Sequence, residues 1–475
     1  MNPNNPSPTV PPLSTLNQVL QVVPLAPVPI QPVVRPRPRF PKRLIYTIVL
    51  VAIIVIFGGL VSKFILPLLG GGSSSQNASL IWWGLFEDQS SVNSLIAAYQ
   101  KDHPNVKIEY KLQSQPDYRE RLTSSLNKGT GPDIYTLHNT WVPMLKKYLY
   151  PIPEKVMSTE DFLQTFYPVA SSDLILGKQI LAIPLQFDSL ALYINDEIFQ
   201  TYNKPIPQTW DEVKQTAKEL TLRDENGVIR QAGIAMGTTQ NVDYWQEIVG
   251  LLMYQNKVDF KNPAKDPTAV ALDYYSRFSR EDKVWDGTQP SSTIAFAGGR
   301  VAMYFAPASR IAEIKQQNPS LRFRVVTAPQ LPKQTPTDPN VFYSTYWAHG
   351  VWSESRQKDA AWEFLKFMTS RESLLALGKK SVYPRRDMQD ELKNDPLLGA
   401  FALQGQEAKS WYLSSRTFDG ATGINSRLSI LFEDAINSIN AKKKAESVLA
   451  DLATGIIEIF ADWGLIPRPA ATPKK

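Results

Sequence analysis

The side chains that most often carry out chemistry in proteins are scarce in this sequence. Its 475 residues include no cysteine and three histidines, His103, His138 and His349. Without cysteine the chain has no disulfides, thiolate zinc sites, iron–sulfur clusters or cysteine nucleophiles. Three histidines far apart in sequence also disfavour a metal site built from several imidazoles. We therefore expect neither a metal nor a cofactor.

Adjacent acidic residues are the remaining candidates for catalysis. Such pairs include residues 211–212, 281–282 and 433–434. Glycoside hydrolysis needs two carboxylates about 5–10 Å apart on either side of one bond, whereas neighbours in sequence point in different directions. The sequence contains no Gly-x-Ser-x-Gly elbow, P-loop or HExxH motif. A carbohydrate-active enzyme is therefore the weakest functional hypothesis.

The charges are distributed unevenly along the chain. Residues 1–70 hold six of the 51 Lys and Arg residues and none of the 45 Asp and Glu residues, so residues 71–475 carry 45 charges of each sign. A nucleic-acid-binding domain needs a basic face. The large C-terminal part is formally neutral, and we expect no nucleic-acid partner.

The N-terminal segment is rich in proline. Residues 1–41 contain 12 of the 37 prolines and no acidic residue. Proline removes backbone donors and fixes φ, which prevents regular helices and sheet ladders. We predict that residues 1–43 form a disordered tail with some polyproline II structure. A solvated tail and a ligand for a proline-binding module both remain open.

An apolar segment follows this tail. Residues 44–61 are 18 consecutive uncharged residues, and the apolar stretch resumes after Lys63 and continues to residue 69. About 20 such residues span the hydrocarbon core of a bilayer. We predict a transmembrane anchor at 44–69, preceded by basic residues that keep the tail in the cytoplasm and place the rest outside. A cleaved signal peptide fits less well, because the preceding region is too long. The Gly- and Ser-rich residues 70–78 are predicted to form a flexible linker.

Strand and helix patterns alternate in the rest of the chain. Residues 106–112 alternate apolar and polar side chains, as in a strand with one exposed face. A helix is predicted at 118–128 and a strand at 133–137. Thr209 and Glu212 form the sequence signature of a capping box, which predicts that a helix starts there. This alternation is typical of an α/β layer with a mostly parallel sheet.

Seven segments, in the right order, resemble the family 1 extracellular solute-binding proteins, the maltose-binding-protein class that serves ABC importers. They lie at residues 81–88, 99–108, 126–134, 177–195, 207–212, 296–303 and 360–368. The most specific is the sequence PQTWDE at 207–212. The resemblance covers residues 79–460.

This resemblance implies a two-lobed α/β fold of the type II periplasmic-binding-protein kind, with a ligand held between the lobes. The first lobe is expected at about 79–187 and 340–375, and the second at about 188–328 and 376–475. The implied ligand is a small solute, a sugar or oligosaccharide. The implied partners are ABC permease subunits, and the binding domain is expected to be a monomer. A surface receptor or adhesion protein with the same fold but no transport role is the alternative.

A sugar site needs aromatic faces for the C–H surfaces of the ring and carboxylates or amides for its hydroxyls. The candidate ligand-binding residues are Glu87, Asp88, Asn139, Trp141, Asp188, Trp245, Trp285, Tyr304, Tyr346, Trp347, Tyr383 and Arg385. The resemblance places most of them near the cleft, whereas Trp245, Trp285 and Tyr304 are chosen as aromatic residues of the second lobe. Packing inside the protein remains an alternative role for these three and for Trp141.

The sequence departs from the family pattern at two points. Oligosaccharide-binding relatives often carry a stacking Trp shortly after the segment that corresponds to residues 296–303. Here the sequence continues YFAPASR, and Tyr304 or Arg310 is expected to take the place of that Trp. Many relatives are periplasmic or are anchored through a lipid on a cysteine, which this chain lacks.

Overall fold

A computed structural model describes residues 77–468, except 334, 336, 379 and 380. The predicted tail at 1–43 and anchor at 44–69 lie outside these residues, as does the linker up to residue 76. Within the described part of the chain, no helix has the length and apolar character needed to cross a membrane.

The first lobe is built on a six-stranded mixed sheet. Its strand order is β2-β1-β3-β14-β4, and β7 also pairs with β14. The strands are β1 (Ala78–Gly84), β2 (Val106–Leu112), β3 (Ile134–His138), β4 (Leu149–Tyr150), β7 (Ile183–Pro184) and β14 (Trp347–Trp352). Strand β1 is parallel to β2 and β3, whereas β14 is antiparallel to β3, β4 and β7.

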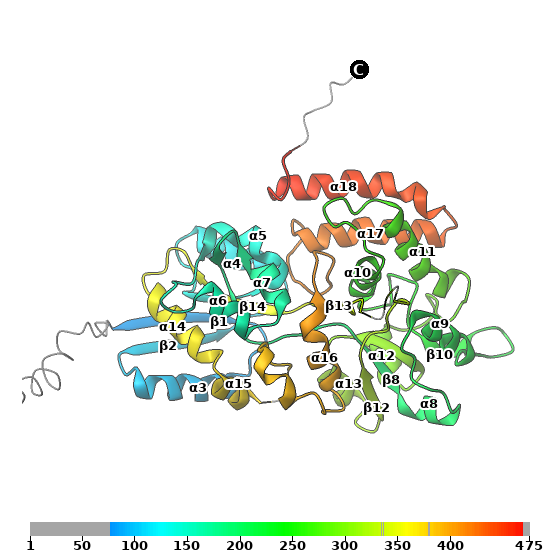
Figure 1. The fold of residues 1–475 in the computed structure, drawn as a ribbon, viewed down its shortest axis with the longest axis horizontal. Coiled ribbons are helices and arrows are strands. Elements are labelled where there is room, and N and C mark those ends of the chain that lie inside the picture. Colours follow the sequence, from blue (N-terminus) through cyan, green and yellow to red (C-terminus); the bar gives the residue numbers. More distant parts are fainter. Residues whose placement is uncertain (1–76, 334, 336, 379–380, 469–475) are drawn as a thin grey trace, which may run out of the picture. The chain divides into compact units, whose positions relative to one another are not determined.

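Helices follow most of these strands and cover the sheet. They are α3 (Gln89–Asp102), α4 (Tyr118–Asn127), α5 (Val142–Leu145), α6 (Thr159–Thr165), α7 (Pro168–Leu174), α14 (Lys358–Met368) and α15 (Arg371–Leu377). Figure 1 shows α4 and α5 on one side of β1 and β2, and α3 and α15 on the other. A short hairpin, β5 (Ile175–Leu176) with β6 (Gln179–Ile180), follows α7.

The second lobe contains a five-stranded sheet with the order β12-β8-β11-β10-β9. The strands are β8 (Ala191–Asn195), β9 (Leu222–Arg223), β10 (Ile229–Ile234), β11 (Val301–Ala306) and β12 (Phe323–Val326). Only β10 and β11 are parallel among the pairs of this sheet. The helices between these strands are α8 (Asp196–Thr201), α9 (Trp210–Glu219), α10 (Trp245–Gln255), α11 (Asp266–Arg280), α12 (Ser292–Ala297) and α13 (Arg310–Gln317).

The C-terminal part of the described chain is mainly helical. It includes α16 (Gly399–Gln404), α17 (Ile424–Asn440) and α18 (Leu449–Asp462), together with the small sheet of β13 (Phe342–Tyr343) and β15 (Ala408–Lys409). Short 3-10 helices occur at η2 (Asn139–Trp141), η3 (Lys146–Tyr148), η4 (Arg386–Glu391), η5 (Gly405–Glu407) and η6 (Ala445–Val448). Helices α17 and α18 lie side by side (Figure 1), and Arg427 pairs with Asp462 between them.

The observed elements confirm the prediction of a two-lobed α/β fold and several local predictions. The strand at Val106–Leu112 has the predicted bounds. Both hydrogen bonds of the capping box between Thr209 and Glu212 are present at the start of α9. The strands of the alternating stretch from which a mostly parallel sheet was predicted, β1, β2 and β3, are parallel, but each sheet as a whole is mixed. In the first lobe β14 enters the sheet from the opposite direction after the chain returns from the second lobe, and in the second lobe β8 is antiparallel to both of its neighbours.

Two chain segments that connect the sheets run beside each other. Residues 185–190 lead from β7 to β8, and residues 341–346 lead to β14. Ser189 and Ser344 form an antiparallel bridge. The carbonyl of Asp188 accepts hydrogen bonds from Ser344 Oγ at 2.8 Å and from Thr345 N at 3.2 Å. The two crossings therefore act as one paired connection.

Candidate ligand-binding cleft

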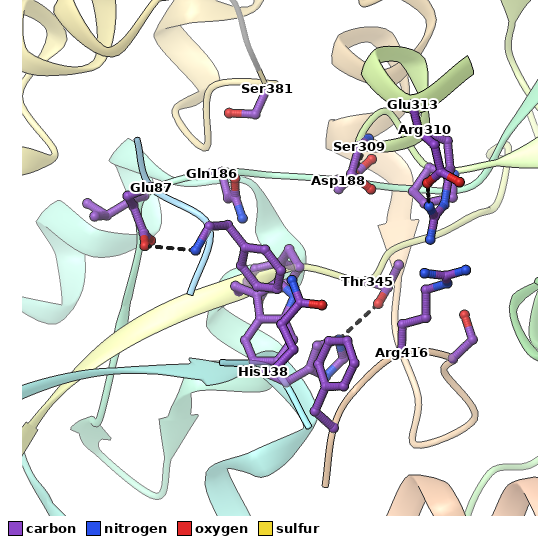
Figure 2. Close-up of a pocket in the computed structure, with 18 of the residues that line it drawn as sticks. Glu87, His138, Gln186, Asp188, Ser309, Arg310, Glu313, Thr345, Ser381 and Arg416 are labelled. Carbon is purple, nitrogen blue, oxygen red and sulfur yellow. Dashed lines mark hydrogen bonds and ion pairs between the residues drawn. The ribbon is translucent and has the colours of Figure 1, made fainter. Parts of the chain in front are cut away.

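Residues from both lobes and from the paired crossings line a cleft of about 540 Å³. The volume lies in the range of sites that enclose small molecules. The lining residues come from the loop after β1, the end of β3, the two crossings, the start of α10, the turn before α13 and the loop at 415–418. Figure 2 shows Glu87 and Gln186 on one side, and Arg310, Glu313 and Arg416 together on the other.

Aromatic side chains form one part of the cleft wall. Trp347, at the start of β14, has its ring centroid 5.0 Å from that of Phe86 and 6.2 Å from that of Phe418. Phe86 is 40% exposed, and the other two are half-buried. These three rings give the cleft an apolar face against which a flat apolar surface can pack.

Glu87 is held firmly by its neighbours in the first lobe. Its Oε1 lies 3.0 Å from Nε2 of His349. Its Oε2 accepts hydrogen bonds from the backbone N–H groups of Leu85 and Phe86 and from the hydroxyl of Tyr110, each 3.2 Å away. Burial opposes ionisation, but His349 and the backbone N–H groups of Phe86 and Glu87 lower the pKa of Glu87 to about 2. Glu87 is therefore a fixed negative charge at the cleft wall.

His138, the last residue of β3, is a neutral member of the wall. Burial lowers its pKa to about 3. Its Nδ1 lies 2.8 Å from Thr140 Oγ1, and its Nε2 lies 2.9 Å from Thr345 Oγ1 (Figure 2). Asn425 Nδ2 donates in turn to Thr140 Oγ1 at 2.7 Å. This chain of hydrogen bonds joins the first lobe to one crossing and to α17.

Asp188 lies in the first crossing and reaches the second lobe. Its carboxylate accepts backbone hydrogen bonds from Ser189, Ala308 and Ser309 at 2.7–3.1 Å. Burial nevertheless raises its pKa to about 7. Because both oxygens are already bonded to backbone groups, Asp188 joins the crossing to the turn before α13.

Arg310 and Tyr244 form a polar wall in the second lobe. Arg310 Nε donates to the Tyr244 hydroxyl, the guanidinium pairs with Glu313, and its Cζ lies 5.5 Å from the centroid of the Tyr244 ring. Arg310 is 8% exposed. Arg310 lines the cleft. That Tyr304 or Arg310 takes the place of the missing stacking Trp stays a prediction.

Glu247 and the loop at 415–418 form a further polar part of the cleft wall. Glu247 is fully buried, and its Oε1 accepts hydrogen bonds from the N–H of Ser415 at 2.7 Å and from its Oγ at 2.9 Å. Burial raises the pKa of Glu247 to about 7. The next residue, Arg416, lines the same cleft.

The structure brings five of the predicted residues to the cleft: Glu87, Asp88, Asp188, Tyr346 and Trp347. Asp88 also caps α3, where its Oδ2 accepts hydrogen bonds from Ser90 and Ser91. The Tyr346 hydroxyl donates to Asp173 Oδ2 at 2.9 Å. Their contacts with a ligand remain predictions.

The structure places the other seven outside the cleft lining: Asn139, Trp141, Trp245, Trp285, Tyr304, Tyr383 and Arg385.

Three of these seven are buried aromatic residues with clear packing roles. Trp141 is fully buried between Tyr118 and Trp347. Trp285 is also fully buried, and its Nε1 donates to Asn241.

Tyr304 is 1% exposed, and its hydroxyl lies 2.7 Å from Thr293 Oγ1. Large aromatic side chains are buried more often than not, which explains these positions.

The remaining four either form hydrogen bonds with nearby residues or are buried. Asn139 donates to Asp173 at 2.9 Å, and Arg385 forms a two-pronged pair with Asp387. Trp245 and Tyr383 are each 4% exposed.

The sequence analysis missed several lining residues, chiefly Tyr244, Glu247, Arg416 and Phe418. Tyr244 and Glu247 are three residues apart at the start of α10, so they face the same side, whereas the predicted Trp245 points elsewhere. A lone acidic residue in the apolar run WQEIVGLLM was a usable signal. The loop residues had no comparable signal.

Residues 83–374 match the family described as bacterial extracellular solute-binding proteins. The chain is similar to the maltotriose-binding protein of Pyrococcus abyssi, with 24% identity over 356 residues that cover 71% of this chain and 73% of that protein. It is also similar to the multiple sugar-binding protein of Streptococcus mutans, with 21% identity over 305 residues that cover 61% of this chain and 70% of that protein.

Solved structures show the same fold. A cyclo/maltodextrin-binding protein complexed with maltotetraose superposes with a TM-score of 0.67 at 16% identity, over 82% of this chain and 99% of that one. The sugar-binding protein MalE from the phytopathogen Xanthomonas citri gives a TM-score of 0.67 at 17% identity, over 83% and 100%. With the family match over more than half of its length, the chain belongs to the bacterial extracellular solute-binding proteins, a non-enzymatic family with a two-lobed periplasmic-binding-protein fold.

Proposed function

We propose that this protein captures a sugar or short oligosaccharide in the cleft and delivers it to an ABC importer. The observation that carries the proposal is the composition of the wall. Phe86, Trp347 and Phe418 present aromatic faces, and Arg310, Glu247 and Arg416 present polar groups from the second lobe. A pyranose has C–H faces that pack on aromatic rings and hydroxyls that need donors and acceptors.

The names of the relatives support a carbohydrate ligand. They include a maltotriose-binding protein, a maltodextrin-binding protein bound to maltotetraose and a protein bound to mannotriose. The permease partner is implied by the family match.

Calorimetric titration of the full-length protein tests the proposal. Maltotriose, maltotetraose, mannobiose and mannotriose serve as probes, with a tripeptide and a polyamine as controls of other ligand classes. The protein must be kept in a detergent without a sugar head group, because such head groups compete for the site. At a hundredfold excess over Kd, a bound sugar stabilises the folded state by about 2.7 kcal/mol. Binding of only the peptide or polyamine would refute a carbohydrate ligand.

We further propose that residues 44–69 anchor the protein in the cell membrane with the cleft outside. The support is the uncharged apolar segment and the basic residues before it. Protease added to intact cells should then digest the C-terminal body, and the chain should stay in the membrane pellet after carbonate washing. A protected body would refute the orientation, and release into the supernatant would refute the anchor.

Loss of import tests the transport step. Deleting the gene should abolish uptake of the sugar that the protein binds. A cell that takes up the sugar normally without this protein would favour a receptor over a transport component.

A further inference from the structure

Glu247 has one carboxylate oxygen without a partner in the part of the chain that the structure describes. Its side chain is fully buried, and Oε1 is bonded to Ser415. Oε2 is buried and receives no hydrogen bond. A buried polar atom without a partner is energetically costly. Glu247 lies in the wall of the cleft, so a bound molecule can supply the missing donor.

Arg416 is a second polar group in the cleft wall without a hydrogen-bond partner among the described residues. Within the described residues its guanidinium makes no hydrogen bond or ion pair, and the side chain is exposed to the cleft. Its backbone has φ of 51°, and that of Phe418 has φ of 51° as well. Non-glycine residues rarely adopt this left-handed conformation, and it is maintained where the surroundings impose it.

The surroundings of the 415–418 loop supply this constraint. Ser415 is bonded to Glu247, and the Tyr343 hydroxyl donates to the carbonyl of Leu413 at 2.8 Å. On the other side, the buried Asp419 accepts hydrogen bonds from Asn425 and Ser426 at the start of α17. Ser415 directly precedes Arg416, so its hydrogen bonds to Glu247 also hold the Glu247 carboxylate near Arg416 in the loop.

We infer that Glu247 Oε2 and the Arg416 guanidinium bind the same uncharged sugar unit. Oε2 accepts a hydrogen bond from a ring hydroxyl, and Arg416 donates to the oxygen of that hydroxyl or of its neighbour. Both residues line the same cleft. A hydroxyl can donate and accept at once, so one sugar hydroxyl can satisfy both an acceptor and a donor of the cleft wall. The inference rests on the proposed carbohydrate function and names the residues that determine specificity.

The charges of the cleft favour an uncharged sugar over a uronic acid or a sugar phosphate. Carboxyl groups of Glu87, Asp88, Asp188, Glu247 and Glu313 line it. Burial raises the pKa of Asp188 and Glu247 to about 7, so these two carry only part of a negative charge at neutral pH, whereas Glu87 stays ionised. The lining also contains two arginines, one of which already pairs with Glu313. An anionic group placed there meets more carboxylates than unpaired guanidinium groups, and like charges in a confined site repel.

Calorimetric titration of the full-length protein in a detergent without a sugar head group tests this inference. The probes are maltotriose, mannotriose and digalacturonate. We expect Glu247→Gln and Arg416→Ala each to weaken binding of the tighter neutral probe about ten- to hundredfold. The double variant should lose little more affinity than the single variant that binds more weakly, because both groups contact one sugar unit. Glu225→Gln, an exposed change in a turn of the second lobe, should bind as the wild type does.

The outcomes separate this inference from the proposed function. If the wild type binds none of the neutral probes, the carbohydrate function itself fails. If the wild type binds but both single variants stay within about threefold of it, the assignment of Glu247 and Arg416 is overturned. Tighter binding of digalacturonate than of the neutral probes would overturn the inference that the ligand is an uncharged sugar.

Monodeoxy derivatives of the tighter neutral probe decide the matter if Glu247→Gln does not fold. One derivative should bind the wild type about tenfold more weakly than the parent sugar, and this difference should shrink in Arg416→Ala. Equal losses in both proteins for every derivative would contradict the inference.

Discussion

Arg119 connects the first lobe to the segment that follows the loop at 415–418. Replacing it tests how much these contacts stabilise the folded protein. The residue lies on α4 and is 4% exposed. Its Nε donates to the carbonyl of Asp419, and its Nη2 donates to Thr422 Oγ1. Its Cζ also lies 5.4 Å from the centroid of the Trp463 ring, beyond the end of α18.

The magnitude follows from these contacts. Arg119→Ala removes two hydrogen bonds worth about 1 kcal/mol each and leaves a buried carbonyl unsatisfied, which costs about 1–3 kcal/mol. The cation–π contact contributes about 0.5–1 kcal/mol. We therefore expect the free energy of unfolding to fall by about 3.5–6 kcal/mol. Affinity for the bound sugar should fall as well, because the loop that carries Arg416 loses part of its support.

Urea unfolding followed by tryptophan fluorescence measures the first effect, and calorimetric titration with maltotriose measures the second. Lys128→Ala, an exposed change just beyond the same helix, is the control and should alter neither quantity. Arg119→Lys keeps the charge but not the two-pronged donor, so it should fall between the alanine variant and the wild type. A loss below about 1 kcal/mol for Arg119→Ala would refute the reasoning.

Three further predictions follow from burial and packing. Trp347→Ala should weaken maltotriose binding about tenfold or more in a calorimetric titration, whereas Trp141→Ala should lower the free energy of unfolding by about 3–5 kcal/mol because its ring is fully buried; the reverse pattern would contradict both. Burial raises the pKa of Asp188 from 3.8 to about 7, so the folded state binds more protons than the unfolded state in this window. Relative to Asp188→Asn, the free energy of unfolding of the wild type should therefore fall as the pH rises from about 4 to about 7, by up to about 1.4 kcal/mol per pH unit. Parallel urea-unfolding profiles of the two proteins would exclude this titration. Gly233→Ala would bring a Cβ within 1.9 Å of the carbonyl oxygen of Ala217, so we expect a loss of about 3 kcal/mol or more, and wild-type stability in the same assay would contradict the close packing of β10 on α9.

Local sequence patterns predicted individual elements better than their pairing. The alternation at 106–112 and the capping box at Thr209 are properties of a few neighbouring residues, and both appear as predicted. Strand direction depends on how the chain returns from the other lobe. For that reason no local pattern could show that β14 is antiparallel to β3.

The same distinction explains the outcome for the cleft. Residues directly after strands, such as Glu87, could be proposed from position because strand ends converge on one edge of a sheet. At the start of α10, one residue of register separates Tyr244, which lines the cleft, from the buried Trp245. Arg416 and Phe418 depend on a left-handed backbone that tertiary contacts maintain, so the sequence alone gave no reason to choose them.

The paired crossings have a consequence for how occupancy of the cleft can be sensed. Gln186, Asp188 and Thr345 lie on these strips of backbone and also line the cleft. On the proposed function, a sugar in the cleft lies against the same segments of backbone that would bend if one lobe turned relative to the other. Under that proposal, binding would act on the angle between the lobes directly, through the residues that connect them.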